Sequence, residues 1–197
     1  MGGPSSCAER TIRGEFAIEV GAFARKIVER AAWTDLLTLG LIHQSEEKTT
    51  TGFGSEFNRI LQRSPRPVLI VPEMADSPLD KALLAYDGSA KSEEALYLST
   101  YMAKNWGIAL VVVVAGDELA SSALHRARSY LSWRDVEAEY IPAQRPAYKS
   151  ILATAALHNC NYIIMGGYGY RPILQLVLGS TATKVLRRSE IPTLVCR

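Results

Sequence analysis

Glycine and hydroxyl residues are concentrated near the end of the chain, in the stretch GGYGYRPILQLVLGST. They follow the pattern G-x2-G-x9-G-S with one more hydroxyl residue after it, and the residues are Gly166, Gly169, Gly179, Ser180 and Thr181. Glycine lets a backbone approach a phosphate oxygen without a Cβ in the way, and hydroxyl groups add hydrogen-bond donors. The pattern therefore predicts a phosphate-binding loop, whereas a plain turn and helix cap would explain only Gly179 and Ser180.

The elements around this loop favour the same interpretation. The run NYIIM before Gly166 is typical of a buried strand, and GSTATKVLRRS is typical of a helix, whose N-terminus attracts phosphate. Asp87 ends another apolar run, KALLAYDGS. Open α/β sheets bind ligands beyond the carboxyl ends of their strands, and an acid there accepts hydrogen bonds from a ribose or base. Taken alone, Asp87 is also an ordinary turn residue.

From residue 79 onward, strand patterns alternate with helix patterns. Strands are expected at 81–89, 109–116, 135–142, 161–167 and 191–197, and helices at 90–106, 122–131, 146–159 and 179–189. Short connections between alternating elements predict a doubly wound parallel α/β domain.

The first 73 residues contain only part of this pattern. Strands are expected at 10–16, 35–42 and 67–73, and helices at 17–32 and 54–64. Moving residues 54–72 forward by 125 positions gives seven identities in nineteen, and DLLTLG matches NYIIMG at a shift of 126. We therefore expect a partial, degenerate unit at 1–73, a linker, and a complete unit at 79–197.

Composition and charge argue against several classes of function. The chain has 197 residues, a net charge of +2 and no basic block, so a nucleic-acid surface is not indicated. No apolar run is long enough for a membrane span, and the cysteines Cys7, Cys160 and Cys196 form no metal-ligand or redox pair. A cytoplasmic protein without a metal site of its own is expected.

The region 79–197 resembles the universal stress protein family. The resemblance rests on LLAYDGSAKSEEAL, VVVVAGDE, MGGYGYRPILQLVLGSTATKVLRRS and IPTLVCR. It implies the strand order 3-2-1-4-5 and bound ATP, with Mg²⁺ bridging the phosphates. It also implies that Asp87 contacts the adenosine and that the backbone of Val114 faces the adenine. The phosphates would be held by Gly166, Gly169, Gly179, Ser180 and Thr181.

The first unit resembles the same family but departs from it where a ligand would bind. Gly40 is kept, His43 stands in place of the second glycine, and Gly54 comes one residue late. The strand that would carry the acid is absent. We therefore expect no ATP binding in this half.

Three functions are compatible with the sequence. An ATP-binding regulatory protein of the stress response is favoured, because the motif offers phosphate ligands but no base or nucleophile for catalysis. A slow ATPase and an assembly scaffold that binds no nucleotide remain open. The cations Lys91, Arg171 and Lys184 are interpreted as solvated charges.

The resemblance also bears on assembly, because last strands of the family pair across a dimer axis. Here PVLIVPE and PTLVC are expected to pair within the chain as a pseudo-dimer, and a homo-oligomer is the alternative. The first unit lacks its central strand, which leaves the edge of DLLTLG unpaired. Either a longer form of the protein or a partner is expected to supply that strand.

Overall fold

The computed structural model describes residues 14–41, 55–115, 118–169, 177–178 and 180–196. In chain order the helices and strands of the described residues are α1 (Phe23–Ala31), β1 (Leu37–Leu41), α2 (Ser55–Arg63), β2 (Val68–Pro72), β3 (Lys81–Ala85), α3 (Ala90–Trp106), β4 (Ala109–Ala115), α4 (Glu118–Ser132), β5 (Glu139–Ala143), α5 (Ala147–Leu157), β6 (Tyr162–Gly166), β7 (Tyr168–Gly169), β8 (Val177–Leu178), α6 (Ser180–Leu186) and β9 (Thr193–Cys196).

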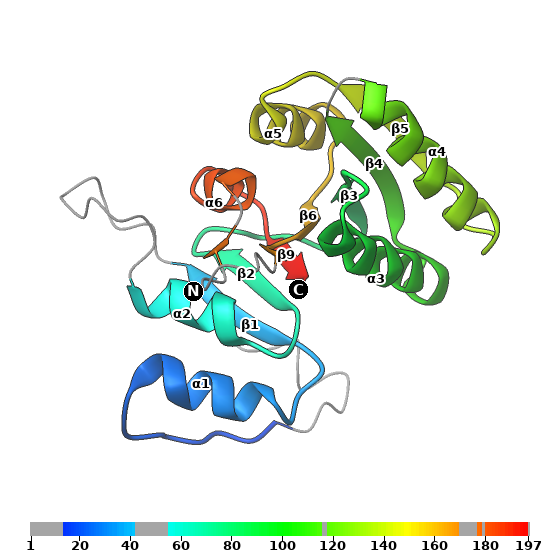
Figure 1. The fold of residues 1–197 in the computed structure, drawn as a ribbon. Helices are drawn as coiled ribbons and strands as arrows, with labels where there is room; N and C mark the ends of the chain where they lie inside the picture. The colour runs from blue at the N-terminus through cyan, green and yellow to red at the C-terminus, as the bar shows by residue number, and fades with distance from the viewer. Residues whose placement is uncertain (1–13, 42–54, 116–117, 170–176, 179, 197) are drawn as a thin grey trace.

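Seven strands form one sheet in the order β1-β2-β9-β6-β3-β4-β5. All neighbours in it are parallel except β2 and β9, which run antiparallel side by side (Figure 1). The strands β3, β4, β5, β6 and β9 have the order 3-2-1-4-5 when these five are numbered along the chain. The expected α/β class and this strand order are confirmed.

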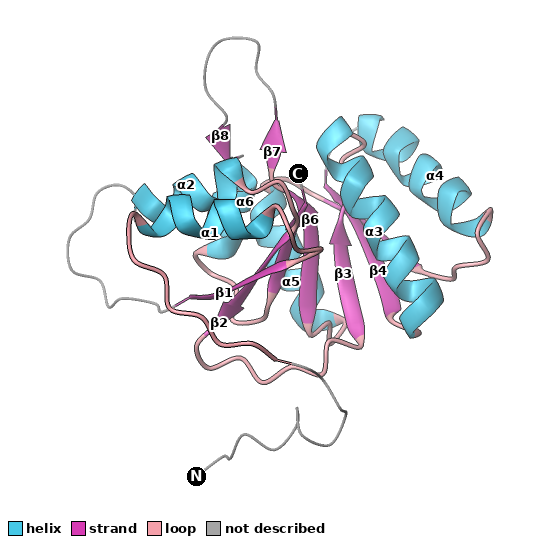
Figure 2. Ribbon diagram, turned by 90° about the horizontal axis from the view of Figure 1, so that it is seen from below, coloured by secondary structure: helices cyan, strands magenta, loops and turns pink. Residues whose placement is uncertain are grey.

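Helices cover both faces of the sheet, as Figure 2 shows. Side chains from α2, α5 and α6 pack on one face around Leu83, Val111 and Ile163, and α1 packs against α2. Side chains from α3 and α4 pack on the other face around Leu84 and Val112. The continuous aliphatic run of β4 is buried on both sides, which is typical of a parallel sheet between two helical layers.

The strand pair β1–β2 repeats the pair β6–β9 in register. Leu37 lies opposite Val68 in the first pair. Ile163, 126 residues after Leu37, lies opposite Thr193, 125 residues after Val68, in the second pair. The next three residue pairs along the two ladders correspond in the same way. The similarity found by shifting the sequence therefore has a structural counterpart.

An approximate two-fold axis relates the two strand pairs. It passes between Leu69 and Leu194, which face each other where β2 and β9 meet. The turns that enter β2 and β9 are also alike, because Ser64 Oγ donates to the Arg66 carbonyl at 2.9 Å and Ser189 Oγ donates to the Ile191 carbonyl at 2.7 Å. The last strands of both halves thus pair within the chain, as expected.

Several expected boundaries are wrong. Residues 14–22 belong to no helix or strand, so the described part of the segment 10–16 is not a strand and the helix expected from residue 17 begins at Phe23. Gly21, with φ of 138°, interrupts the helix pattern, and Arg30 Nε donates to Glu19 Oε1 at 2.9 Å, which holds the preceding segment alongside α1. Strand β5 starts four residues later than expected, at Glu139.

The glycine loop contains an element that the sequence patterns do not indicate. Strands β7 and β8 form a short antiparallel pair in which Gly169 lies opposite Val177. Parts of the loop after β6 therefore pair as two short strands.

Candidate functional site

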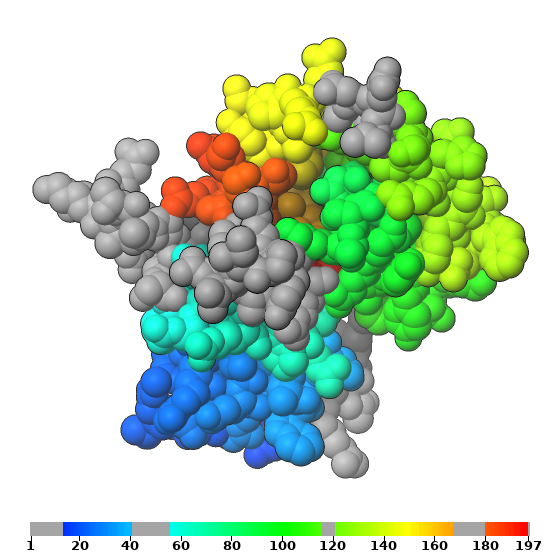
Figure 3. Space-filling view, in the orientation of Figure 1, coloured from blue at the N-terminus to red at the C-terminus, as the bar shows by residue number. Residues whose placement is uncertain are grey.

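A crevice of about 570 Å³ opens at the carboxyl ends of β3, β4 and β6. The order of the sheet reverses between β3 and β6, which is the place where open α/β sheets bind ligands. Helices α3, α5 and α6 surround this hollow in the space-filling view (Figure 3). Its volume lies within the range of roughly 300–1,000 Å³ usual for small-molecule sites.

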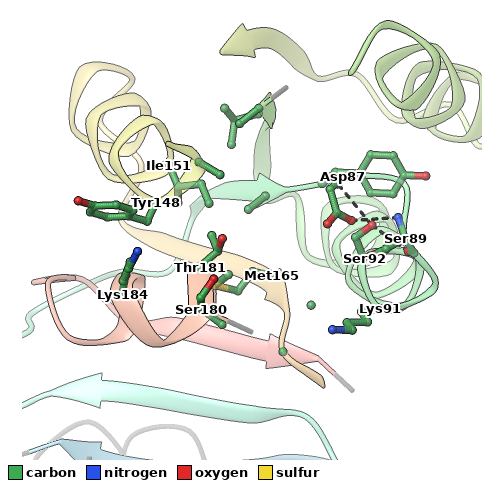
Figure 4. Close-up of a pocket in the computed structure, with 18 of the residues that line it drawn as sticks. Asp87, Ser89, Lys91, Ser92, Tyr148, Ile151, Met165, Ser180, Thr181 and Lys184 are labelled. Atoms are coloured by element: carbon green, nitrogen blue, oxygen red, sulfur yellow. Dashed lines mark hydrogen bonds between the residues drawn. The ribbon is translucent and has the colours of Figure 1, made fainter. Parts of the chain in front are cut away.

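Asp87 forms one wall of the crevice, two residues after the end of β3. Its Oδ1 accepts a hydrogen bond from the Ser89 amide at 2.9 Å, and its own amide donates to Ser92 Oγ at 3.4 Å (Figure 4). Burial on its own would raise the pKa of Asp87, but the hydrogen bonds from Ser89 and Ser92 and the charge of Lys91 outweigh it and lower the pKa. The carboxylate is therefore ionised and oriented at neutral pH.

The loop that carries Asp87 is held from both sides. Tyr86 donates to Glu93 Oε1 at 2.6 Å, and Arg126 Nη2 donates to the Gly88 carbonyl at 2.8 Å. Gly88 has φ of 73°, and a Cβ there would meet the Arg126 guanidinium. The turn thus fixes the direction of the Asp87 side chain before any ligand binds.

The opposite wall comes from the start of α6. Ser180 and Thr181 lie there with Lys184, one turn further along the helix (Figure 4). Lys184 Nζ lies 5.1 Å from the ring centroid of Tyr148, which belongs to α5. The hydroxyl residues Ser180 and Thr181 therefore lie across the crevice from Asp87, and the Lys184 side chain is turned toward Tyr148 (Figure 4).

The remaining walls are partly apolar. Ile151 of α5 and Met165 of β6 contribute aliphatic surface, and Val113 and Ala115 line the crevice from β4. The side chain of Val114 lies on the other face of the sheet and is 1% exposed, because successive side chains of a strand alternate between faces. The resemblance assigns only the Val114 backbone to the adenine, and that contact stays a prediction.

Gly166 lies on the wall formed by β6, and its lack of a side chain has a structural reason. A Cβ at this position would lie 2.5 Å from the carbonyl oxygen and 2.6 Å from the carbonyl carbon of Lys91 in the first turn of α3. Close packing of β6 against α3 therefore requires glycine here, whatever binds in the crevice. Its neighbour Gly167 also lines the space.

The remaining residues of interest from the sequence lie in β7 or outside the described residues. Gly169 lies in β7, and its place relative to the crevice stays a prediction. Gly179 and Arg171 lie outside the described residues, as does His43 of the first unit. The structure thus brings together Asp87 and the Gly166, Ser180 and Thr181 positions.

The charge of the crevice favours an anionic ligand. Its described lining holds the cations Lys91, Arg145 and Lys184 and the single carboxylate Asp87. Two of these cations, Lys91 and Lys184, were expected to be solvated charges, and Lys184 is exposed while Lys91 is partly buried. One acid that accepts hydrogen bonds and several cations suit a ligand with both hydroxyl and phosphate groups.

The described lining offers little for catalysis. It contains no histidine or cysteine, and Asp87, held ionised, is its only carboxylate. Nor do the described parts of the chain hold a cluster of three or more metal-ligating side chains. The arrangement is suited to binding.

Arg145 and Tyr148 are lining residues that the sequence analysis does not identify. They flank the start of α5, which follows β5. In a doubly wound domain every helix after a strand begins at the carboxyl edge of the sheet, so the first turn of this helix was a detectable candidate.

Among the described residues, no helix combines the length and the apolar character that a membrane crossing needs.

Comparison with known proteins relates this fold to one family. Residues 115–197 match the model of the universal stress protein family. A universal stress protein of Synechocystis sp. is 28% identical over 167 residues, which cover 83% of this chain and 58% of that protein.

Solved structures of universal stress proteins are also similar to this fold. A universal stress protein from Archaeoglobus fulgidus superposes with a TM-score of 0.75 at 26% identity, covering 88% of this chain and 66% of that chain. A putative universal stress protein from Pseudomonas aeruginosa shares the fold, with a TM-score of 0.63, 19% identity and coverage of 86% and 66%.

The chain thus spans 58% of the length of its Synechocystis relative and 66% of the archaeal structure. The crevice, the strand order and these matches lead to one conclusion. From residue 115 to residue 197 the chain carries a domain of the universal stress protein family.

Proposed function

We propose that this protein is an ATP-binding regulatory protein of the stress response and that the crevice between Asp87 and Ser180 holds the nucleotide. The observation that carries the proposal is the position of an ionised carboxylate opposite two hydroxyl residues, with a lysine also in the lining, at the point where the strand order reverses. A ribose offers hydroxyl donors to Asp87, and phosphate groups suit the cations and the hydroxyl groups.

The walls of the crevice suggest how the nucleotide is oriented. The adenosine would lie toward Asp87 and the β4 wall, where Val113 offers apolar surface. The phosphates would lie toward Ser180 and Thr181, with Lys184 nearby. Mg²⁺ would arrive with the nucleotide and neutralise the phosphate charge, because the described lining has only one carboxylate of its own.

The ligand would act through occupancy. A nucleotide shifts a conformational or assembly equilibrium only by as much as it prefers one state over the other. The described lining holds no histidine or cysteine, and its one carboxylate, Asp87, is assigned to the ribose, so turnover is a poor basis for a signal. We assign binding to the unit at 79–197 and none to the unit at 1–73.

The first experiment identifies the natural ligand. The protein is purified without added nucleotide and denatured, and any released small molecule is identified by mass spectrometry. We expect ATP at close to one molecule per chain. An empty protein that also shows no heat of binding with Mg-ATP in calorimetry would refute the proposal and favour an assembly scaffold.

A matched pair of variants then tests the site. Asp87→Asn keeps an acceptor for the Ser89 amide but removes the charge, so the loop should hold while hydrogen bonds to the ribose weaken. A hydrogen bond to a charged group contributes about 1.5–3 kcal/mol, which corresponds to an affinity loss of roughly 10- to 100-fold. The control is Asp76→Asn, an exposed position in the linker before β3, which should bind as the parent does. Equal affinities of the two variants would remove Asp87 from the site.

Slow hydrolysis is tested with the same variants. Phosphate release over many turnovers that persists through repurification and disappears in Asp87→Asn would make the protein an ATPase. We expect release no faster than in buffer.

A further inference from the structure

A second hollow lies between α3 and α4, on the face of the sheet opposite α5 and α6 (Figure 2). We call it the α3–α4 groove. Its volume of about 480 Å³ lies within the range of roughly 300–1,000 Å³ usual for small-molecule sites. The buried side chains of Leu96 and Tyr86 give it an apolar floor. Of its described lining residues, only Tyr86 also lines the nucleotide crevice, so the groove is a separate space.

One side of α4 and the turn after it form most of the wall. Arg126, Tyr130 and Arg134 recur at intervals of four residues, and Ser129 and Trp133 have the same spacing. The Trp133 amide donates to the Ser129 carbonyl at 3.0 Å, which continues the helical spacing past the last residue of α4. Residues four apart lie on one helical face. Aromatic rings and guanidinium groups are therefore presented to the groove together.

The aromatic rings of this wall offer flat surface to a ligand. Trp133 is 88% exposed, although burial of a ring this large is favourable. Tyr130 is half-buried, and its ring is supported by Tyr97 of α3, with ring centroids 4.9 Å apart. A planar ring that enters the groove gains stacking contacts and removes exposed apolar surface from water.

The guanidinium group of Arg134 is held in place before any ligand arrives. Its central carbon lies 3.6 Å from the centroid of the Tyr130 ring, and its Nη1 donates to the Tyr130 carbonyl at 3.4 Å. A guanidinium has more N–H donors than this contact uses, and its planar fork matches the geometry of a carboxylate. Because the group is already ordered, less entropy is lost when an anion binds to it.

The charge of the groove favours an anion. Its described lining holds Arg126, Arg134 and His125 but only one carboxylate, Glu93. Glu93 is already engaged, because it accepts a hydrogen bond from the Tyr86 hydroxyl at 2.6 Å and lies 3.9 Å from Arg126 Nη1. Arg134 forms no ion pair with a described residue. One guanidinium beside the aromatic wall is thus left to pair with a ligand.

We infer that the α3–α4 groove binds a small molecule that has a planar aromatic ring and one anionic group, such as an aromatic carboxylate or sulfonate. The ring stacks on Trp133 and Tyr130, and the anionic group accepts hydrogen bonds from Arg134. Both anchors line one hollow of about 480 Å³, so a single small molecule reaches both. This ligand is distinct from the nucleotide assigned to the crevice.

The experiment uses the full chain and naphthoate as the probe. Nitrogen–proton NMR spectra show the indole N–H signals of the three tryptophans, Trp33, Trp106 and Trp133, each assigned with its phenylalanine variant. Their exposed fractions are 89%, 63% and 88%, but Trp133 alone among them lines the groove. We expect added naphthoate to move the Trp133 signal in a saturable way and to leave the other two unchanged.

A neutral probe and a pair of variants test the charge. Naphthamide keeps the ring but lacks the negative charge, and we expect it to bind at least about tenfold more weakly than naphthoate. Arg134→Gln should weaken naphthoate binding to a similar extent, and Arg134→Lys should recover part of the affinity. The matched control is Arg128→Gln, which removes the same charge from α4. Arg128 lies 4.7 Å from the centroid of the Tyr140 ring and does not line the groove, so this variant should bind naphthoate as the parent does.

Four results would overturn the inference. The first is a Trp133 signal that does not move at any soluble concentration of naphthoate. The second is equal movement of all three indole signals, which would show nonspecific adsorption to exposed rings. The third is equal weakening by Arg134→Gln and Arg128→Gln, because only the net charge would then matter. The fourth is a peptide rich in aspartate and phenylalanine that moves the Trp133 signal at far lower concentration than naphthoate, which would assign the groove to a protein partner.

Discussion

Gly166→Ala tests whether β6 requires glycine for packing. The new Cβ would lie 2.5 Å and 2.6 Å from two backbone atoms of Lys91, and backbone cannot rotate out of the way as a side chain can. The start of α3 would have to move away from β6. Overpacking of this kind lowers the free energy of unfolding by about 1–3 kcal/mol. Alanine has less conformational entropy than glycine in the unfolded chain, which raises the free energy of unfolding by about 0.5–1 kcal/mol.

The midpoints of these two ranges give an expected net loss of about 1 kcal/mol in the free energy of unfolding, with an upper bound of about 2.5 kcal/mol. For a chain of this size a loss of about 1 kcal/mol lowers the melting temperature by roughly 2–4 °C. The assay is thermal and urea unfolding of nucleotide-free protein, so that a change in ligand binding does not contribute.

Gly40→Ala is the matched control, because Gly40 is the residue of β1 that corresponds to Gly166 in register. A Cβ at Gly40 has no neighbouring atom within 4 Å. This variant should be as stable as the parent or slightly more stable. If Gly166→Ala is as stable as the parent, or if both variants lose the same stability, the packing argument is refuted.

Two further predictions concern ionisable groups. Burial raises the pKa of the Cys160 thiol to about 11 and raises that of Cys196 as well. In a Cys7→Ser chain at pH 8, neither thiol of the folded protein should react with a disulfide reagent in the time that the urea-unfolded chain reacts fully. Rapid reaction of the folded chain would contradict the burial of the two thiols. A hydrogen bond from His158 lowers the pKa of Glu139 in the folded protein below its unfolded value of about 4.3. The pair therefore stabilises the fold at pH values above about 4.3, and this stabilisation is lost as the pH falls through the lower pKa of the folded state. Urea unfolding should show Glu139→Gln less stable than the parent at pH 6, by under about 1 kcal/mol, and the gap should close by pH 3; an equal gap at both pH values would exclude the ion pair as its cause.

Local patterns predict the second half of the chain well. Helix α3 was expected over residues 90–106 and is found there, because its end is set by Gly107 with φ of 69°. Strand β4 was recognised by its aliphatic run. In both cases neighbouring residues determine the structure, so the sequence is sufficient.

Features that depend on distant contacts were missed. The pair β7–β8 has two residues in each strand, too few for any periodicity. The helical pattern around Glu19 is overridden by its contact with Arg30, eleven residues away. Such contacts leave no local signal.

The crevice also contains residues that the local sequence predicts and residues whose position depends on distant contacts. The place of Asp87 in the crevice was predictable because it closely follows the apolar run that forms β3. The lining position of Tyr148 depends on which helix start meets which strand end, which only the strand order decides. The sequence also shows that β6 ends in glycine, but not whether the close neighbour of Gly166 is a ligand or the backbone of α3.

The antiparallel contact between β2 and β9 has a consequence for how the protein behaves on dilution. Two separate chains joined through their last strands would come apart as their concentration falls. Here both strands belong to one polypeptide, so each is present near the other at an effective concentration that the connecting chain sets, on the order of millimolar for short flexible connections. The contact at Leu69 and Leu194 therefore persists at any protein concentration, and neither strand edge is available to a second molecule.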